Sequence, residues 1–341
     1  MTQAWAIEAH DLVKTFGTNR AVDGVDLLVE TGTVYGVLGP NGAGKTTTIR
    51  MLATLLRADS GTATIFGHNV FTEPQAVRQL IGLTGQSATV DETLSAVENL
   101  MIFSKLLGLS TKDARRKTAE LLEEFSLTDA AKRPLKNFSG GMRRRLDLAA
   151  SLIAQPPLIF LDEPTTGLDP RTRAQMWDTI RRLVRDGSTI VLTTQTLDEA
   201  DQLSQRVAVI DHGKVVAEGT PDELKASVGV STVVLKVADA VAGKVTAGEK
   251  ASWESATLEK TQRVVTEVLG DVAVVVGADG RVTAPMQDPE RITDLLIRLR
   301  DAKIHLAEVS VQKPTLDEVF LAITGHTAED TSPETDEEVA A

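Results

Sequence analysis

The stretch Gly39-Pro-Asn-Gly-Ala-Gly-Lys-Thr-Thr47 decides the fold of this chain. It follows the apolar run 34–38, which predicts a buried central strand, and it leads into a predicted helix that begins at Lys45. Glycines in this pattern let backbone N–H groups turn inward around phosphate oxygens, and the helix N-terminus adds positive potential. The spacing G-x-x-x-x-G-K-[ST] therefore predicts a phosphate-binding loop, in which Lys45 contacts the β- and γ-phosphates and Thr46 ligates Mg²⁺.

A pair of carboxylates ends a second apolar strand, in Leu158-Ile-Phe-Leu-Asp-Glu-Pro164. This arrangement predicts that Asp162 lies over the Mg²⁺ and that Glu163 lies beside the γ-phosphate. A base at Glu163 can take a proton from the attacking water, an effect typically worth ~10²–10⁴ in rate. Structural acids are common at strand ends, but their pairing with a phosphate loop favours nucleotide hydrolysis.

The long interval between Lys45 and Asp162 has a mostly helical pattern. It contains Phe138-Ser-Gly-Gly-Met142, a second phosphate-binding turn at the head of a predicted helix. One chain cannot easily wrap two such loops around one nucleotide. The sequence therefore predicts an ATP that is shared between two chains.

Strands and helices alternate along the first part of the chain, which predicts an α/β fold with a parallel sheet covered on both faces. Strands are predicted at residues 4–9, 21–29, 34–38, 62–66, 158–161, 189–193 and 207–210. Residues 87–154 are predicted to form a helical subdomain, with apolar spacing at 94–107 and 114–125, and a further helix is predicted at 172–184.

A second unit, of α+β type, is predicted at residues 230–325. Its expected order is strand 232–238, a loose stretch, helix 257–269, strands 272–276 and 281–285, helix 289–301, strand 305–311 and a last helix at 316–323. The order β-α-β-β-α-β is that of the ferredoxin-like split pattern. The unit holds no phosphate loop and no paired carboxylates, so we expect it to serve dimerisation or docking.

The composition excludes several other classes of protein. There are no cysteines, which excludes disulfides and thiolate zinc sites. No apolar run approaches the ~20 residues that span a bilayer, so we expect a cytoplasmic protein whose membrane role depends on a partner. The net charge of −12 argues against binding to nucleic acid. Residues 326–341 are rich in acids and lack Lys and Arg, which predicts a disordered tail.

Together these motifs resemble those of the ATP-binding subunits of ABC transporters, and they occur in the family's order. The resemblance implies a P-loop (RecA-like) ATPase core at residues 1–229, with ATP and Mg²⁺ held between two copies of the chain and a separate transmembrane permease as partner. It implies that Phe16 stacks on the adenine of ATP. It also implies that ATP contacts the phosphate loop (Gly39, Pro40, Asn41, Gly42, Ala43, Gly44, Lys45, Thr46, Thr47), the signature turn (Ser139, Gly140, Gly141) and Asp169. It also implies that Gln86 touches Mg²⁺ and joins Glu163 and Gln195 in catalysis.

Two positions depart from the family's pattern. The signature turn ends in Met142, where glutamine is commonest, and Gln195 stands where the family usually has a histidine that contacts the γ-phosphate. A glutamine can donate an amide hydrogen bond but cannot carry a proton or a charge. Because Glu163 is intact, we expect slower hydrolysis and an active site that still works. The run 143–145, three arginines, is predicted to be a solvated face or a contact with a partner subunit.

The same departures narrow the resemblance to the daunorubicin/doxorubicin-resistance type of ATPase subunit, as does the ending Lys313-Pro-Thr-Leu-Asp-Glu-Val-Phe-Leu321. This implies an exporter of a drug or hydrophobic metabolite. One alternative is a soluble ABC-type ATPase that acts on ribosomes or DNA, which the single phosphate loop, the negative charge and the lack of a heptad insert disfavour. Another is a nucleotide-gated switch with little hydrolysis, which only Gln195 suggests.

Overall fold

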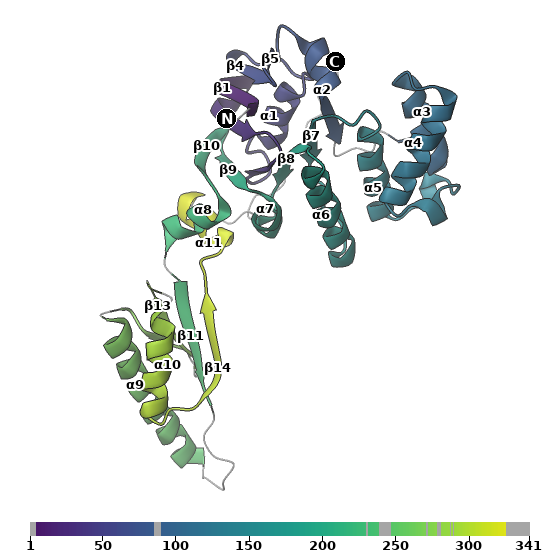
Figure 1. Cartoon of the computed structure of the whole chain (residues 1–341). Helices are drawn as coiled ribbons and strands as arrows, with labels where there is room; N and C mark the ends of the chain where they lie inside the picture. Colours follow the sequence, from purple (N-terminus) through teal and green to yellow (C-terminus); the bar gives the residue numbers. More distant parts are fainter. Residues whose placement is uncertain are drawn as a thin grey trace. The chain divides into compact units, whose positions relative to one another are not determined.

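The computed structural model describes residues 5–84, 90–229, 231–238, 247–270, 272–277, 281–286, 288 and 290–324 (Figure 1). They form two compact units, one within Met1–Pro221 together with Phe320–Ala341 and one within Asp222–Val319. Each unit has its own sheet and its own hydrophobic core. The predicted acidic tail, 326–341, lies outside the described residues.

A six-stranded sheet with the order β10-β9-β3-β8-β7-β6 forms the centre of the first unit. Its strands are β3 (Val34–Leu38), β6 (Ile81–Thr84), β7 (Leu158–Asp162), β8 (Thr189–Thr194), β9 (Arg206–Asp211) and β10 (Lys214–Gly219). Every neighbouring pair is parallel except β9 and β10. All residues of β3, β7 and β8 are buried, as expected for strands covered on both faces. The predicted parallel sheet is therefore confirmed.

The carboxyl ends of β3, β7 and β8 lie at one edge of this sheet. Leu38 pairs with Thr194, and Asp162 pairs with Thr193. The loops at this edge of an open α/β sheet are where ligands bind. The phosphate loop after β3, the acids at the end of β7 and Gln195 after β8 therefore follow neighbouring strand ends.

An antiparallel sheet with the order β2-β1-β4-β5 completes the ATPase core. Its strands are β1 (Trp5–Phe16), β2 (Asn19–Glu30), β4 (Ser60–Ile65) and β5 (His68–Asn69). β1 and β2 are longer than the predicted strands 4–9 and 21–29, because they form a continuous hairpin that turns at Gly17, where φ is 56°. One hydrophobic cluster joins both sheets to α1 (Lys45–Leu52), and Ile7, Ile49 and Phe160 belong to it.

Three helices form the predicted helical subdomain: α3 (Ala96–Leu106), α4 (Thr111–Glu124) and α5 (Gly140–Ser151). Each begins after a serine whose hydroxyl accepts a hydrogen bond from a backbone N–H of the first turn, and these serines are Ser95, Ser110 and Ser139. Such caps satisfy N–H groups that have no partner inside the helix. The remaining helices of the unit are α2 (Pro74–Leu80), α6 (Pro170–Arg185) and α7 (Leu197–Leu203), with short 3₁₀ turns η1 (Thr128–Ala130) and η2 (Leu135–Asn137).

The second unit contains an antiparallel sheet with the order β12-β13-β11-β14. Its elements are β11 (Ser231–Val237), α9 (Ala247–Leu269), β12 (Val275–Val276), β13 (Arg281–Met286), α10 (Arg291–Asp301) and β14 (Leu306–Gln312). Val233, Leu235 and Val282 form a core with Val265 of α9 and Leu295 of α10. Two further helices, α8 (Pro221–Val228) and α11 (Leu316–Thr324), lie at the ends of this segment of the chain.

Two predictions for the second unit are wrong in detail. The stretch before residue 257 is helical from Ala247 instead of loose, because its alanines, lysine and glutamates favour a helix without an apolar period. The strand predicted at 272–276 is only Val275–Val276, and Val275 is 62% exposed. The run is apolar, but only Val275 and Val276 pair with β13, at the edge of the sheet.

Candidate nucleotide-binding and hydrolysis site

The phosphate loop has backbone geometry that only glycine satisfies at its key positions. Gly44, just before α1, has a φ of 102°, and a Cβ there would lie 2.3 Å from the carbonyl oxygen of Ala21. At Gly39 a Cβ would lie 2.2 Å from the carbonyl oxygen of Ile210. The loop is thus packed closely against neighbouring backbone, while Asn41 and Gly42 at its tip are exposed. A loop of this shape presents N–H groups to an anion.

Lys45 is held inside the loop that precedes it. Its ammonium group donates hydrogen bonds to the carbonyl oxygens of Gly39, at 2.7 Å, and Pro40, at 2.8 Å. Burial lowers the pKa of Lys45, and the nearby carboxylates of Glu163 and Asp162 oppose that shift. The positive charge of Lys45 therefore lies between the phosphate loop and the two acids, Asp162 and Glu163, that were expected near the phosphates.

The two predicted magnesium ligands with described positions contact each other. The Thr46 hydroxyl donates to Asp162 Oδ1 at 3.2 Å, and the Thr193 hydroxyl donates to the same oxygen at 2.5 Å. Two oxygens bound to one Mg²⁺ at ~2.1 Å and at right angles are ~2.9 Å apart, so this hydroxyl–carboxylate pair fits the ion. The third predicted ligand, Gln86, lies outside the described residues.

Glu163 has an unusual backbone conformation for a residue other than glycine. Its φ is 48°, in the left-handed region, which costs on the order of 1–3 kcal/mol and persists only where the surroundings enforce it. Its N–H donates to the carbonyl of Thr193 at 3.2 Å and to the Thr193 hydroxyl at 3.1 Å. The Thr166 hydroxyl donates to the Glu163 carboxylate at 3.1 Å. Side chain and backbone are therefore both fixed.

The predicted signature turn and the predicted interface residue Asp169 lie at the starts of two neighbouring helices. Ser139 caps α5, and Asp169 caps α6 by accepting hydrogen bonds from the N–H and the hydroxyl of Thr172, at 3.0 and 2.6 Å. These bonds hold the pKa of Asp169 below its usual range. A Cβ at Gly141 would lie 2.3 Å from Thr172 Cγ2, so only glycine lets the two helices approach so closely.

The structure describes both Phe16 and Gln195. Phe16, at the tip of the β1–β2 hairpin, is 49% exposed, and the Lys14 ammonium lies 5.6 Å from its ring centroid. Gln195 directly follows the buried strand β8 and is half-buried. An exposed ring can stack on a base, and a side chain at this sheet edge is on the side of Asp162 and Glu163.

The arginines at 143–145 point in different directions, so the run does not form one solvated face, which was one of its two predicted roles. Arg143 pairs with Glu92 at 2.7 Å, and Arg145 donates to the carbonyl of Phe125 at 3.2 Å. Arg144 turns inward to the end of β7 and donates to the carbonyl oxygens of Asp162, Glu163 and Pro164. Successive residues of an α-helix are turned by about 100°, so three consecutive arginines point in three different directions.

Two further functional candidates were not found from the sequence. Thr193 was assigned only to a strand, and Glu199 was not singled out. Glu199 is 1% exposed and accepts hydrogen bonds from Thr165, after β7, and from Trp177, in α6. Glu199 lies in α7, the helix after β8, and its sequence context carries no distinguishing signal, because acids at helix starts are usually exposed.

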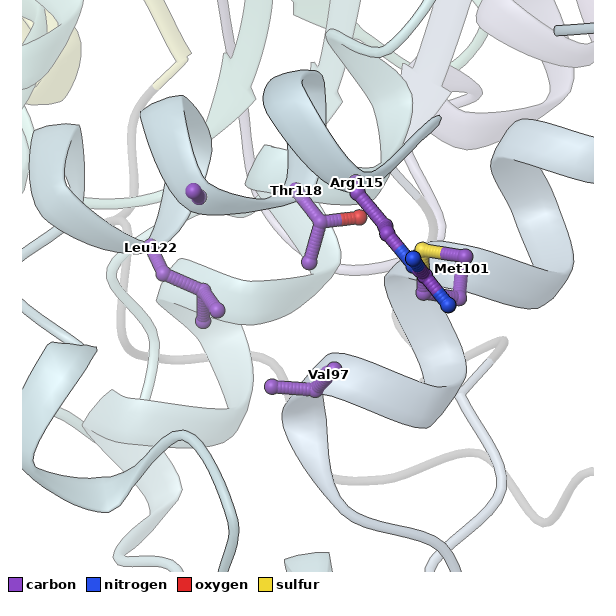
Figure 2. Close-up of a pocket in the computed structure, with 6 residues that line it drawn as sticks. Val97, Met101, Arg115, Thr118 and Leu122 are labelled. Carbon is purple, nitrogen blue, oxygen red and sulfur yellow. The ribbon is translucent and has the colours of Figure 1, made fainter. Parts of the chain in front are cut away.

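An apolar cavity of about 220 Å³ lies apart from these residues, between α3 and α4 (Figure 2). Its lining comes from Val97, Met101, Arg115, Thr118, Ala119 and Leu122. It lacks the glycine-rich loop and the acids that phosphate and Mg²⁺ require. The candidate site is therefore the sheet edge and not this cavity.

Comparison with known proteins identifies the family of the chain. Residues 22–166 match the ABC transporter family model. The daunorubicin/doxorubicin resistance ATP-binding protein of Streptomyces peucetius is 51% identical over 332 residues, which cover 96% of this chain and 95% of the relative. The doxorubicin resistance ATP-binding protein of Mycobacterium tuberculosis is 42% identical over 94% of this chain and 93% of its own. A solved ATP-binding subunit of an ABC transporter, 27% identical, matches 65% of this chain and 92% of its own with a TM-score of 0.59.

The fold, the site and these matches define the class: the chain belongs to the ABC transporter family and is an ATP-binding subunit with ATP-hydrolysing activity. Within that family it is of the daunorubicin/doxorubicin-resistance type. Among the described residues, no helix is long and apolar enough to cross a bilayer.

Proposed function

We propose that the chain powers the export of a drug or another hydrophobic metabolite through a separate transmembrane permease, while bound to the cytoplasmic face of the membrane. The relatives in Streptomyces peucetius and Mycobacterium tuberculosis are resistance proteins to daunorubicin or doxorubicin, which supports this class of substrate. The observation that carries the proposal is the meeting of Lys45, Thr46, Asp162 and Glu163 at one sheet edge.

The described side chains fit the steps of ATP hydrolysis. Lys45 binds the β- and γ-phosphates. Thr46 and Asp162 would hold Mg²⁺, which would neutralise phosphate charge, and Gln86, outside the described residues, is proposed as a third ligand. Glu163 accepts a proton as the water oxygen bonds to the γ-phosphorus and the bond to the β–γ bridging oxygen breaks. Gln195 donates an amide hydrogen bond toward the γ-phosphate. It carries no charge, so the expected rate is lower than with histidine.

The ATP is proposed to lie between two copies of the chain. Ser139 begins α5, and a Cβ placed at Gly140 would meet no heavy atom within 4 Å. The helix N-terminus at this turn is therefore open to an anion from another molecule. Asp169, at the start of the neighbouring helix α6, is proposed to cross the same interface.

The proposed domains of the chain have different roles. Residues 1–229 form the ATPase domain, with the helical subdomain at 87–154, and residues 230–325 form an accessory domain of ferredoxin-like fold. Its antiparallel order β12-β13-β11-β14, with the element order β-α-β-β-α-β, supports that fold. It is proposed to serve dimerisation or docking to the permease, and residues 326–341 are proposed to be a disordered tail.

Transport in vesicles tests the proposal. Inverted membrane vesicles that hold the chain together with its permease should take up daunorubicin only when ATP and Mg²⁺ are supplied. Lys45→Ala removes a charge-assisted contact worth ~1.5–3 kcal/mol, so ATP affinity and drug uptake should both fall sharply. Uptake that continues unchanged with Lys45→Ala would contradict the assignment of the phosphate loop. ATP hydrolysis without uptake of any hydrophobic compound would contradict export.

A further inference from the structure

Glu163 is held from two sides by different elements. On the side of β8, its backbone N–H donates to Thr193. On the side of α5, its carbonyl oxygen accepts a hydrogen bond from Arg144 at 2.9 Å. A left-handed backbone at a residue other than glycine persists only where contacts of this kind enforce it.

Arg144 contacts the whole turn that carries Glu163. Its Nε donates to the carbonyl of Pro164 at 3.3 Å, and one terminal nitrogen donates to the carbonyls of both Asp162 and Glu163. A guanidinium is a planar fork with five donors, so one side chain can satisfy three consecutive carbonyls. Lysine has the charge but not the fork, and methionine has neither.

The acids around Arg144 add to this backbone contact. Asp147, Asp162, Glu163 and Glu199 all exert a favourable electrostatic effect on the guanidinium, whose pKa is lowered by burial. An arginine stays protonated in proteins even when it is partly buried. Its charge thus faces three carbonyl dipoles and the carboxylates at the end of β7.

We propose that Arg144 is a positioning residue for ATP hydrolysis, because it fixes the backbone of Glu163 and links it to the signature turn at the start of its own helix. The inference rests on the proposed role of Glu163 as general base. Ser139 caps α5, and Arg144 lies little more than one helical turn beyond it. A movement of the signature turn against the partner copy's ATP therefore shifts the guanidinium, and with it the carboxylate of the same chain.

This link gives each copy a way to sense the other nucleotide. The signature turn of one chain contacts the ATP of its partner, and Arg144 transmits that contact to the chain's own base. Displacement of a catalytic group by about 1 Å can lower a rate by ~10²-fold. Closure of the dimer therefore aligns Glu163 through Arg144.

Steady-state hydrolysis by the full-length chain tests the role of Arg144. Arg144→Met should lower kcat by about tenfold or more, while KM for ATP changes by less than about threefold, because the phosphate loop is untouched. Arg143→Met is the matched control, since Arg143 lies on the same helix but pairs with Glu92. The control should keep kcat within about threefold of the native value. Thermal unfolding of both variants reports any loss of stability.

Two further variants separate positioning from mere stability. Arg144→Lys keeps the charge and should restore part of kcat. The double variant Arg144→Met with Glu163→Gln should be no slower in single-turnover hydrolysis than Glu163→Gln alone, because both changes act on one group. Native kcat in Arg144→Met, equal losses in Arg143→Met, or additive losses in the double variant would each overturn the inference. If Glu163→Gln itself hydrolyses ATP at the native rate, the fault lies in the assignment of the base.

Discussion

The carboxylate of Glu199 accepts a hydrogen bond from the hydroxyl of Thr165 at 2.8 Å inside the protein. The indole of Trp177 donates to the same oxygen at 3.3 Å. Glu199 lies in α7, Thr165 follows β7 and Trp177 lies in α6, so one buried acid joins three elements around the site. Burial raises the pKa of Glu199 from its ordinary 4.5, and the hydrogen bonds from Thr165, Thr194 and Trp177 oppose that shift.

Glu199→Gln should make stability less dependent on pH. A carboxyl whose pKa is raised by folding contributes stability that is complete below 4.5 and is lost as the pH rises through the folded-state pKa. Glutamine keeps an acceptor oxygen for Thr165 and has no charge to bury. The free energy of unfolding of the variant, minus that of the native chain, should therefore grow as the pH rises above 4.5.

Denaturant unfolding at a series of pH values measures this difference. Asp198→Asn is the control, because Asp198 is an exposed acid on the same helix and the change alters net charge equally. A difference that shrinks with rising pH would show that Glu199 is stabilised as a carboxylate in the folded chain.

Glu163→Gln should reduce hydrolysis to a small residual rate and leave nucleotide binding intact. The amide cannot accept a proton from water, while the phosphate loop and the signature turn are unchanged. ATP should then hold two copies together. Size-exclusion chromatography with ATP and Mg²⁺ should show a dimer with little phosphate release, and in Lys45→Ala the addition of ATP should not increase the dimer fraction. Hydrolysis at the native rate by Glu163→Gln would rule out this residue as the base.

Gln195→His should raise the rate of hydrolysis. Histidine can carry a proton and a charge at the γ-phosphate, and glutamine can carry neither. Phosphate release measured at saturating ATP should increase, whereas Gln195→Ala, which lacks the donor as well, should reduce it. A large drop in Gln195→His would indicate that neighbouring side chains fit glutamine only.

A chain that ends at Gly229 should bind ATP but assemble less well. Most of the removed residues belong to the second unit, which has its own core, and the phosphate loop and β7 stay in the remaining chain. If two copies of the unit hold the ATPase domains near each other, they raise the effective concentration toward the ~mM range. ATP affinity should be unchanged, while dimerisation without nucleotide, or recovery with the permease, should fall. Transport equal to that of the full chain would exclude both roles.

Much of the site could be predicted from the sequence because its motifs are local. The loop at 39–47 combines glycines, one lysine and two threonines within a few residues, and β3 and β7 are buried throughout, with β7 apolar up to Asp162. Their pairing at one sheet edge follows from the rule that parallel strands end together. The contact of Thr46 with Asp162 was expected on those grounds.

Contacts between distant side chains could not be predicted in this way. The run 143–145 looks uniform as a sequence, but Arg144 alone turns inward, because its position on α5 faces the end of β7. Glu199 resembles an ordinary acid at a helix start, although the packing of α6 and α7 buries it. The first part of α9, from Ala247, could not be predicted either, because its residues favour a helix but do not form an apolar stripe.

By itself, the sequence determined the phosphate loop, the acids at the end of β7, the parallel sheet and the family, since each depends on residues close together in the chain. Only the tertiary structure decided which side chains support the site: Thr193 on Asp162, Thr172 against Gly141, and Arg144 on the backbone of Glu163. The physical reason is that hydrogen bonds and close packing depend on direction and distance. Those are fixed only when elements far apart in the chain have packed together.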